Sequence, residues 1–160
     1  ELYNVNEWYG LDRETGKRLV AEFNASAAMG FLPPLRDAQW YIKMLAEKHG
    51  YQFIAVTSMS SDPFAQKLRI SNLKKLFGEH TFAEYHILGC GDDKDEILME
   101  LSNKYEGCWW VEDKPANAIV GNDLGYNSIL VEHTHNMNMN LPEEIQVVRN
   151  WEEIYALITE

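Results

Sequence analysis

Residues 52–63 read QFIAVTSMSSDP, and the fold class that we predict rests mainly on this stretch. Within 52–56, Gln52 is followed by a short, continuous apolar run, which is typical of a buried strand in a parallel sheet. Asp62 followed by Pro63 predicts the start of a helix, with the aspartate as N-cap and the proline at the first helical position. The helix is expected to end at Gly78. The stretch therefore predicts a strand followed by a helix, the unit from which parallel sheets are built.

The same alternation extends along the chain in both directions. Helices are predicted over 12–23 and 36–49 before this stretch; after it, strands over 85–88, 109–111, 128–131 and 145–148 alternate with helices over 95–105, 115–120 and 151–158. This order predicts an α/β fold with a Rossmann-like parallel sheet flanked by helices, in which ligands bind beyond the carboxyl ends of the strands.

The composition limits the classes of partner. A net charge of −11 argues against wrapping a long nucleic acid, which needs many Lys or Arg at the phosphates. A small phosphate ester stays compatible, because one or two cations or a metal can hold it. No apolar run approaches the roughly 18–20 residues that span a bilayer, and no signal peptide is apparent, so a cytoplasmic protein is expected. Cys90 and Cys108 lack metal-site spacing and are predicted to be free thiols.

Polar residues follow each predicted strand. Thr57 and Ser58 follow the first strand, where their hydroxyls could donate to a phosphate or simply form a turn. Lys94 follows the second strand, where it could neutralise a phosphate or be a solvated surface lysine. Glu112 and Asp113 follow the third strand, and adjacent carboxylates repel unless a cation lies beside them. Mg²⁺ suits such a pair, although Asp113 could equally be the N-cap of the next helix.

The fourth strand is followed by His133, His135 and Asn136. Two histidines at this spacing could bind a transition metal, but no third ligand is apparent. We therefore expect this loop to hold substrate or to pack beneath the site.

The ordered set of motifs resembles motifs two, three and four of the haloacid dehalogenase (HAD) superfamily, and more closely the 5'(3')-deoxyribonucleotidases. The resemblance spans nearly the whole chain. It rests on LPPLRDA at 32–38, FIAVTS at 53–58, LFG at 76–78, DKD at 93–95, VEDKP at 111–115, His135-Asn136 and WEEIY at 151–155.

The resemblance implies a role for each of these residues. Thr57, Ser58, Lys94 and Arg69 would bind the phosphate, Lys94 and Thr57 would act in catalysis, and Asp113 would ligate Mg²⁺ with Glu112 beside it. Residues 1–32 would be the remnant of a small helical cap, in which Phe23 and Met29 touch a base or sugar or pack within the cap. Residues 33–160 would form the α/β core.

One part of the family pattern is missing. Members begin with a central strand that ends in Asp-x-Asp-Gly, and its first aspartate attacks phosphorus; no segment of this chain fits. We expect that strand upstream of Glu1, because omitting a central strand exposes unpaired backbone groups on its neighbours. The native protein is therefore predicted to be longer, or another segment to fill the gap.

The expected function follows from the resemblance. It is Mg²⁺-dependent hydrolysis of a phosphomonoester through an aspartyl-phosphate, with a (deoxy)nucleoside monophosphate as the leading substrate. The alternative is a non-catalytic relative that binds a nucleotide or a protein partner, and homodimer formation stays open. A response-regulator receiver is disfavoured, because its acidic pair precedes its threonine.

Overall fold

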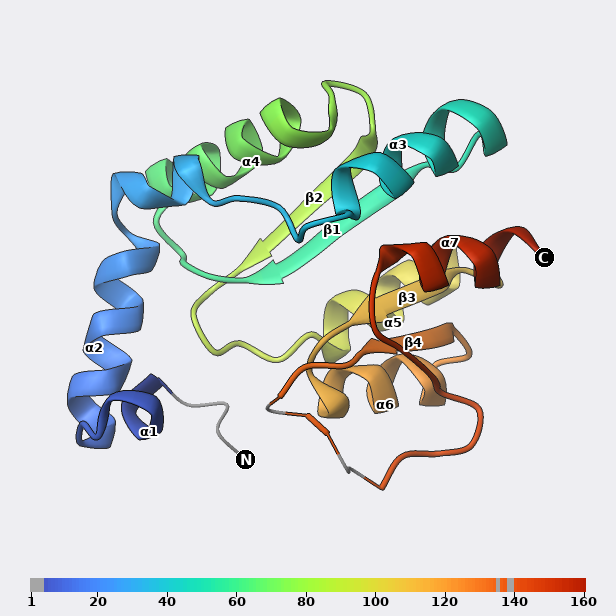
Figure 1. The fold of residues 1–160 in the computed structure, drawn as a ribbon. Coiled ribbons are helices and arrows are strands. Elements are labelled where there is room, and N and C mark those ends of the chain that lie inside the picture. The colour runs from blue at the N-terminus through green and yellow to red at the C-terminus, as the bar shows by residue number, and fades with distance from the viewer. Residues whose placement is uncertain (1–4, 135, 138–139) are drawn as a thin grey trace. The chain divides into compact units, whose positions relative to one another are not determined.

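The computed structural model describes residues 5–134, 136–137 and 140–160. The chain divides into two compact units, one that ends at Asp93 and one that covers Lys94–Glu160, and each is described by itself. The boundary expected between residues 32 and 33 falls inside the first unit. Both units contain parallel strands with flanking helices (Figure 1), which confirms the α/β class.

The first unit contains one two-stranded parallel sheet. Its elements are α1 (Val5–Tyr9), α2 (Arg13–Asn24), the 3-10 helix η1 (Ala27–Phe31), α3 (Ala38–His49), β1 (Phe53–Ser58), α4 (Pro63–Phe77) and β2 (Phe82–Leu88). Helix α4 connects β1 to β2, and α3 and α4 lie on the same side of the two strands (Figure 1). The Asp62 carboxylate accepts a hydrogen bond from the Phe64 amide at 3.0 Å, with Pro63 in the first turn. The predicted strand and its capped helix are therefore confirmed.

Strand β1 differs from the prediction in its burial. A fully buried strand was predicted from the apolar run, but all six residues of Phe53–Ser58 are only half-buried. Among the described residues, β1 pairs with β2 and with no other strand. In the described residues, α3 and α4 lie on the same side of the two strands, so β1 lacks the cover on both faces that buries a central parallel strand.

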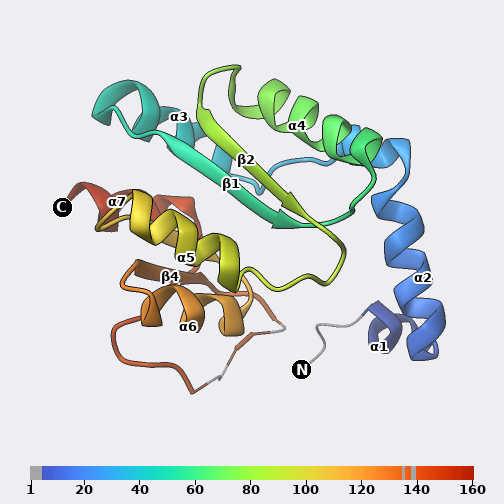
Figure 2. The ribbon, with the colours of Figure 1, turned by 180° about the vertical axis from the view of Figure 1, so that it is seen from behind.

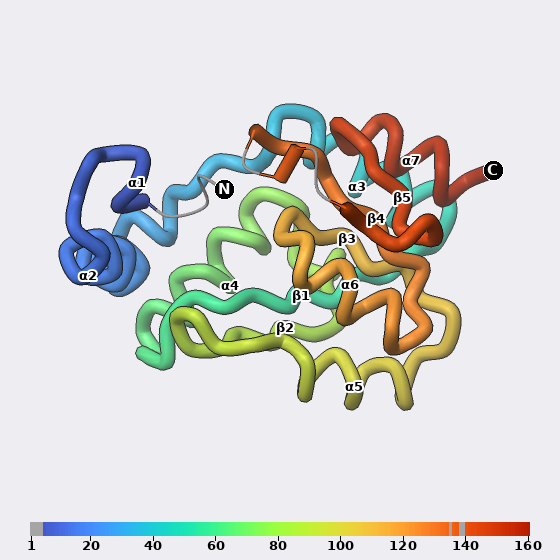
Figure 3. The backbone as a smooth tube through the Cα atoms, turned by 90° about the horizontal axis from the view of Figure 1, so that it is seen from below, coloured from blue at the N-terminus to red at the C-terminus, as the bar shows by residue number. Residues whose placement is uncertain are grey.

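The second unit contains a three-stranded parallel sheet. Its elements are α5 (Asp95–Lys104), β3 (Trp109–Glu112), α6 (Pro115–Asp123), β4 (Asn127–Val131), β5 (Gln146–Val148) and α7 (Trp151–Thr159). The strands run in the order β3-β4-β5, as the tube trace in Figure 3 also shows. The predicted fifth strand is confirmed, although it is one residue shorter than predicted.

Helices cover both faces of this sheet. Leu130 packs with Ala118 of α6, whereas its neighbours Ile129 and Val131 pack with Ile154 of α7. Successive side chains of a strand point to opposite faces, so this pattern places α6 and α7 on opposite sides of β4 (Figure 2).

The strands form two sheets rather than the continuous sheet that the alternation suggested. In the described residues, β1 ends the sheet β1-β2 and β3 ends the sheet β3-β4-β5. Each of these strands therefore presents one edge on which no described strand pairs.

The structure also bears on the cysteines and on membrane-spanning segments. Cys90 and Cys108 carry free thiols, as predicted. In the described ranges, no helix is both long enough and apolar enough to cross a membrane.

Close packing inside the second unit gives a test of the fold. A Cβ atom at Gly121 would overlap the Trp110 ring and lie 2.8 Å from the Ser128 hydroxyl oxygen. We expect Gly121→Ala to destabilise the protein by about 1–3 kcal/mol through overpacking, measured by urea denaturation. Gly30→Ala is the matched control, because a Cβ there meets only Leu68, at an ordinary 3.5 Å. Equal stability of the two variants would contradict this packing.

Candidate functional site

Strand β3 ends with Glu112, whose carboxylate lies on the same face of the strand as the buried Trp110 ring. Residues two apart in a strand share a face, so Trp110 and Glu112 point to the same side of the sheet. The Trp110 ring nitrogen donates to the Asn117 carbonyl of α6 at 3.0 Å, which identifies that side as the α6 side. Glu112 is 7% exposed and is therefore a buried carboxylate.

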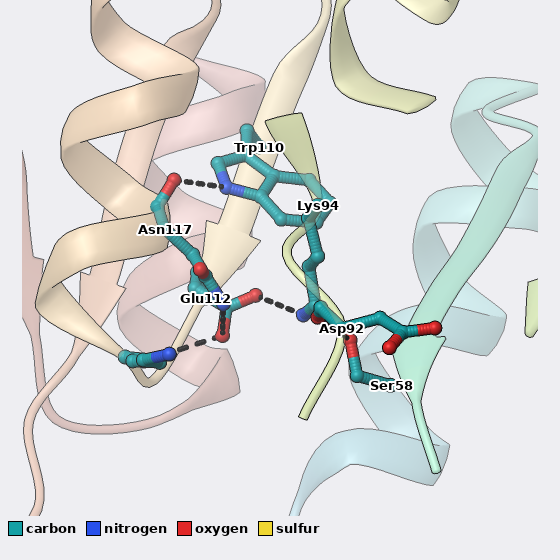
Figure 4. A network of polar contacts seen from close by, with 7 residues as sticks. Ser58, Asp92, Lys94, Trp110, Glu112 and Asn117 are labelled. Atoms are coloured by element: carbon teal, nitrogen blue, oxygen red, sulfur yellow. Dashed lines mark hydrogen bonds and ion pairs between the residues drawn. The ribbon is translucent and has the colours of Figure 1, made fainter. Parts of the chain in front are cut away.

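Both oxygens of Glu112 accept hydrogen bonds from the protein (Figure 4). Lys94, at the N-terminus of α5, donates from Nζ to Oε2 at 2.7 Å. The Asn117 side chain and the Lys114 amide donate to Oε1 at 3.2 and 3.3 Å. The Lys94 side chain is 11% exposed, and its Nζ lies 5.3 Å from the centre of the Trp110 ring. Lys94 is thus a half-buried cation paired with a carboxylate, not the solvated surface lysine of the alternative.

This contact gives the acidic pair its cation. The sequence predicted that Glu112 and Asp113 need a positive charge beside them, and the Lys94 ammonium supplies one at Glu112. The competing account of Asp113 as a helix N-cap is wrong, because the N-cap of α6 is Lys114.

Asn136 fixes the loops that follow β3 and β4. Its amide nitrogen donates to the carbonyls of Asp113 and Val131 at 2.7 and 2.8 Å, and its oxygen accepts from the His133 amide at 2.7 Å. The side chain is 3% exposed. This loop does pack beneath the acidic pair, through Asn136; His135 lies outside the described residues.

The first unit contains the two predicted hydroxyls. Ser58 donates from Oγ to the Asp92 carbonyl at 2.8 Å, so its hydroxyl ties the end of β1 to the loop after β2. Thr57 is half-buried, and its hydroxyl has no hydrogen-bond partner among the described residues. Of the two, Thr57 is therefore the one whose donor is available to a ligand.

Arg69 on α4 is a half-buried cation. Its Nη1 donates to the Asn72 side-chain oxygen at 2.7 Å, and the Asn72 amide donates to the Leu32 carbonyl at 3.0 Å. No carboxylate of the described residues lies within ion-pair distance of it. Burial lowers the pKa of Arg69 below its ordinary value, because desolvation disfavours the charged form. An anion beside this guanidinium would offset that cost.

The two residues assigned to substrate contact lie in different environments. Phe23 is 46% exposed, which leaves its ring accessible. Met29 is 4% exposed and packs with Met59 and Ala65. Contact of Met29 with a substrate would require this cluster to open. Met29 is instead buried against Met59 and Ala65, which lie outside the predicted cap segment 1–32.

The structure therefore brings together part of the predicted site. Lys94, Glu112 and Asp113 meet at the end of β3 in the second unit, whereas Thr57, Ser58 and Arg69 belong to the first. In the part of the chain that the structure describes, no three His, Cys, Asp or Glu side chains are grouped to hold a metal. The sequence analysis did not predict Asn117, which donates a hydrogen bond to Glu112. No motif links an asparagine at this position to the acidic pair.

Comparison with known proteins adds one relative. No family model matches the chain. Over 107 residues, 66% of the chain, it is 32% identical to an uncharacterised 32.4 kDa protein of the Gp30–rIII intergenic region of Enterobacteria phage T4. The match covers 37% of that phage protein, so the chain spans little more than a third of its length.

The buried ion pair generates a stability prediction. Lys94→Met should destabilise the protein by about 3–5 kcal/mol, because it leaves the Glu112 carboxylate buried without its counterion. The double variant Lys94→Met/Glu112→Leu should recover most of this loss, since both charges are gone. Urea denaturation of the two single variants and the double variant measures the coupling. Additive effects would contradict a direct interaction.

Asn136 gives a second stability prediction. Asn136→Ala should cost about 2–4 kcal/mol, because three backbone groups lose their partner. The His133 amide should also exchange its hydrogen faster in hydrogen–deuterium exchange. Asn140→Ala is the control, because Asn140 is exposed. Unchanged protection at His133 would contradict the anchoring role of Asn136.

Proposed function

We propose that this chain is part of a HAD-type phosphohydrolase that cleaves a phosphomonoester with Mg²⁺, with a (deoxy)nucleoside monophosphate as substrate. The observation that carries the proposal is the half-buried Lys94 ammonium, held by Glu112 next to Asp113 at the end of a parallel strand. Covering a lysine is costly unless it is paired, and the Glu112 carboxylate meets this cost while it holds the ammonium at the strand end.

The pairing of Lys94 leaves donors for a ligand. An ammonium carries three N–H groups, and the Glu112 contact uses one of them. The other two would donate to a phosphate oxygen and to the attacking carboxylate. Glu112 in this view positions the lysine, which refines the metal-ligand role that the resemblance implied for it.

Two features of the first unit support phosphate binding. The Thr57 hydroxyl is a donor without a partner among the described residues, and Arg69 is a half-buried cation without a carboxylate in that same part of the chain. A phosphate oxygen accepts hydrogen bonds from both kinds of donor.

Asp113 fits the metal. Mg²⁺ binds through one or two carboxylates and fills its other positions with water and phosphate oxygens, so a cluster of three protein ligands is not required. When bound, the ion would offset the charge of the transferring phosphoryl group. Asn136 holds the Asp113 backbone, which keeps this carboxylate at the end of β3.

The open strand edges support a missing nucleophile strand. In the described residues, β1 and β3 each lack a partner on one edge, and isolated parallel sheets of two or three strands are unusual. We propose that a strand ending in Asp-x-Asp, outside this chain, pairs with these edges and completes a HAD-like core. The residues before α3 would then be part of a cap that closes over the substrate.

The test uses the longer protein that includes this strand, assayed for phosphate release from deoxyribonucleoside monophosphates. Hydrolysis should need Mg²⁺ and stop with EDTA. Asp113→Asn should lower kcat by about 10²–10³-fold, because it removes the charge that holds the metal. Lys104→Met, at the other end of α5, is the control and should leave kcat unchanged.

Two results would overturn the proposal. One is hydrolysis that is equally fast in EDTA; the other is an Asp113→Asn variant that keeps most of its activity. Binding of a deoxyribonucleoside monophosphate without any turnover would favour the alternative, a non-catalytic nucleotide-binding relative.

A further inference from the structure

Helix α4 is cationic in an acidic protein. Between Pro63 and Phe77 it carries Lys67, Arg69, Lys74 and Lys75 and no acidic side chain. The whole chain has 14 Lys and Arg against 25 Asp and Glu. The helix is therefore positively charged in a protein whose net charge is negative. A local cluster of positive charge attracts anions, so we expect an anionic partner at this helix.

Three of these lysines line a hollow on the first unit. The hollow has a volume of about 390 Å³ and is lined by Lys67, Ile70, Ser71, Lys74, Lys75 and Glu79. Three ammonium groups and one carboxylate give the lining a net charge of +2. The Ser71 hydroxyl adds a neutral donor, and Ile70 adds apolar surface.

Two of the three lysines lack a carboxylate partner. Lys74 forms an ion pair with Glu79, and this contact raises the pKa of Lys74 and lowers that of Glu79. For Lys67 and Lys75, no described carboxylate lies within ion-pair distance. Their charges are therefore available to a bound anion.

Exposed aromatic rings flank the hollow. The Lys67 ammonium lies 5.8 Å from the centre of the Phe64 ring, and the Lys75 ammonium lies 5.9 Å from that of Phe31. These rings are 75% and 80% exposed. Such exposure is unusual for phenylalanine, and a flat ring beside a cation can stack a base while the cation holds a phosphate.

We propose that this hollow binds a nucleoside polyphosphate, with its phosphates on Lys67, Lys74 and Lys75 and its base stacked on Phe31 or Phe64. The volume lies within the range of about 300–1,000 Å³ that is usual for small-ligand sites. The three ammonium groups of the lining can contact more than one phosphate, which suits a chain of two or three phosphates. The net charge of −11 disfavours a long nucleic acid at the same surface. This inference goes beyond the proposed hydrolysis, in which none of these side chains takes part.

The test is isothermal titration calorimetry with ADP and, separately, with inorganic tripolyphosphate, both in EDTA. Lys67→Gln/Lys75→Gln should weaken the binding of both ligands by about tenfold or more, since two charge contacts are lost. Phe31→Ala/Phe64→Ala should weaken ADP about threefold or more and leave tripolyphosphate unchanged, because the lost stacking concerns the base alone. These rings are exposed, so their removal should not affect folding.

Two controls separate this site from the proposed hydrolytic site. Lys43→Gln, on α3, removes an exposed lysine that pairs with Glu47 and should leave both affinities unchanged. Thr57→Ala should do the same, because Thr57 is assigned to the hydrolysed phosphate.

Four results would overturn the inference: no ADP binding up to about 1 mM, a range in which even weak sites are detected; equal ADP affinity in the lysine double variant; equal ADP affinity in the phenylalanine double variant; or a loss with Thr57→Ala as large as that with the lysine variant. A thymidine oligonucleotide of about ten residues that binds more tightly than ADP would also contradict it and would indicate a single-stranded nucleic-acid surface.

Discussion

The backbone N–H and C=O groups along an edge of a parallel strand need hydrogen-bond partners wherever that edge is buried, and this requirement applies to both units of the protein. Among the described residues, β1 pairs with a strand on one edge only, and all of its residues are half-buried. Strand β3 ends the second sheet and likewise pairs with a described strand on one edge only. Helices cover the faces of strands but cannot supply ladder hydrogen bonds. Under the proposed function, a strand that pairs at one of these edges would carry the nucleophile.

The Lys94–Glu112 pair is the second constraint. Removing both charges from water costs free energy that their attraction returns only when the geometry is good, and here Asn117 and the Lys114 amide also bind the carboxylate. Such a pair is weak grounds for stability by itself. The proposed function uses its position at a strand end, beside Asp113, whose carbonyl Asn136 binds.

Local sequence signals predicted most of the strands and helices. Features that depend on contacts between distant residues could not be predicted. The Asp62-Pro63 cap and the apolar runs identify strands and helices from a few neighbouring residues. The separation into two sheets could not be predicted, because strand pairing depends on residues far apart in the chain. Lys94 lies in a polar loop sequence that is typical of the surface, and its burial depends on Glu112, 18 residues later. The anchoring by Asn136 likewise depends on a loop conformation that no local pattern encodes.

The proposed function requires that Lys94 and Asp113 serve one phosphate. An NMR titration of the protein with inorganic phosphate and MgCl₂ tests this most directly. We expect the backbone amides of Lys94 and Asp113 to shift together and to follow a single saturation curve. Unshifted amides at both residues, or separate curves for the two, would contradict the account.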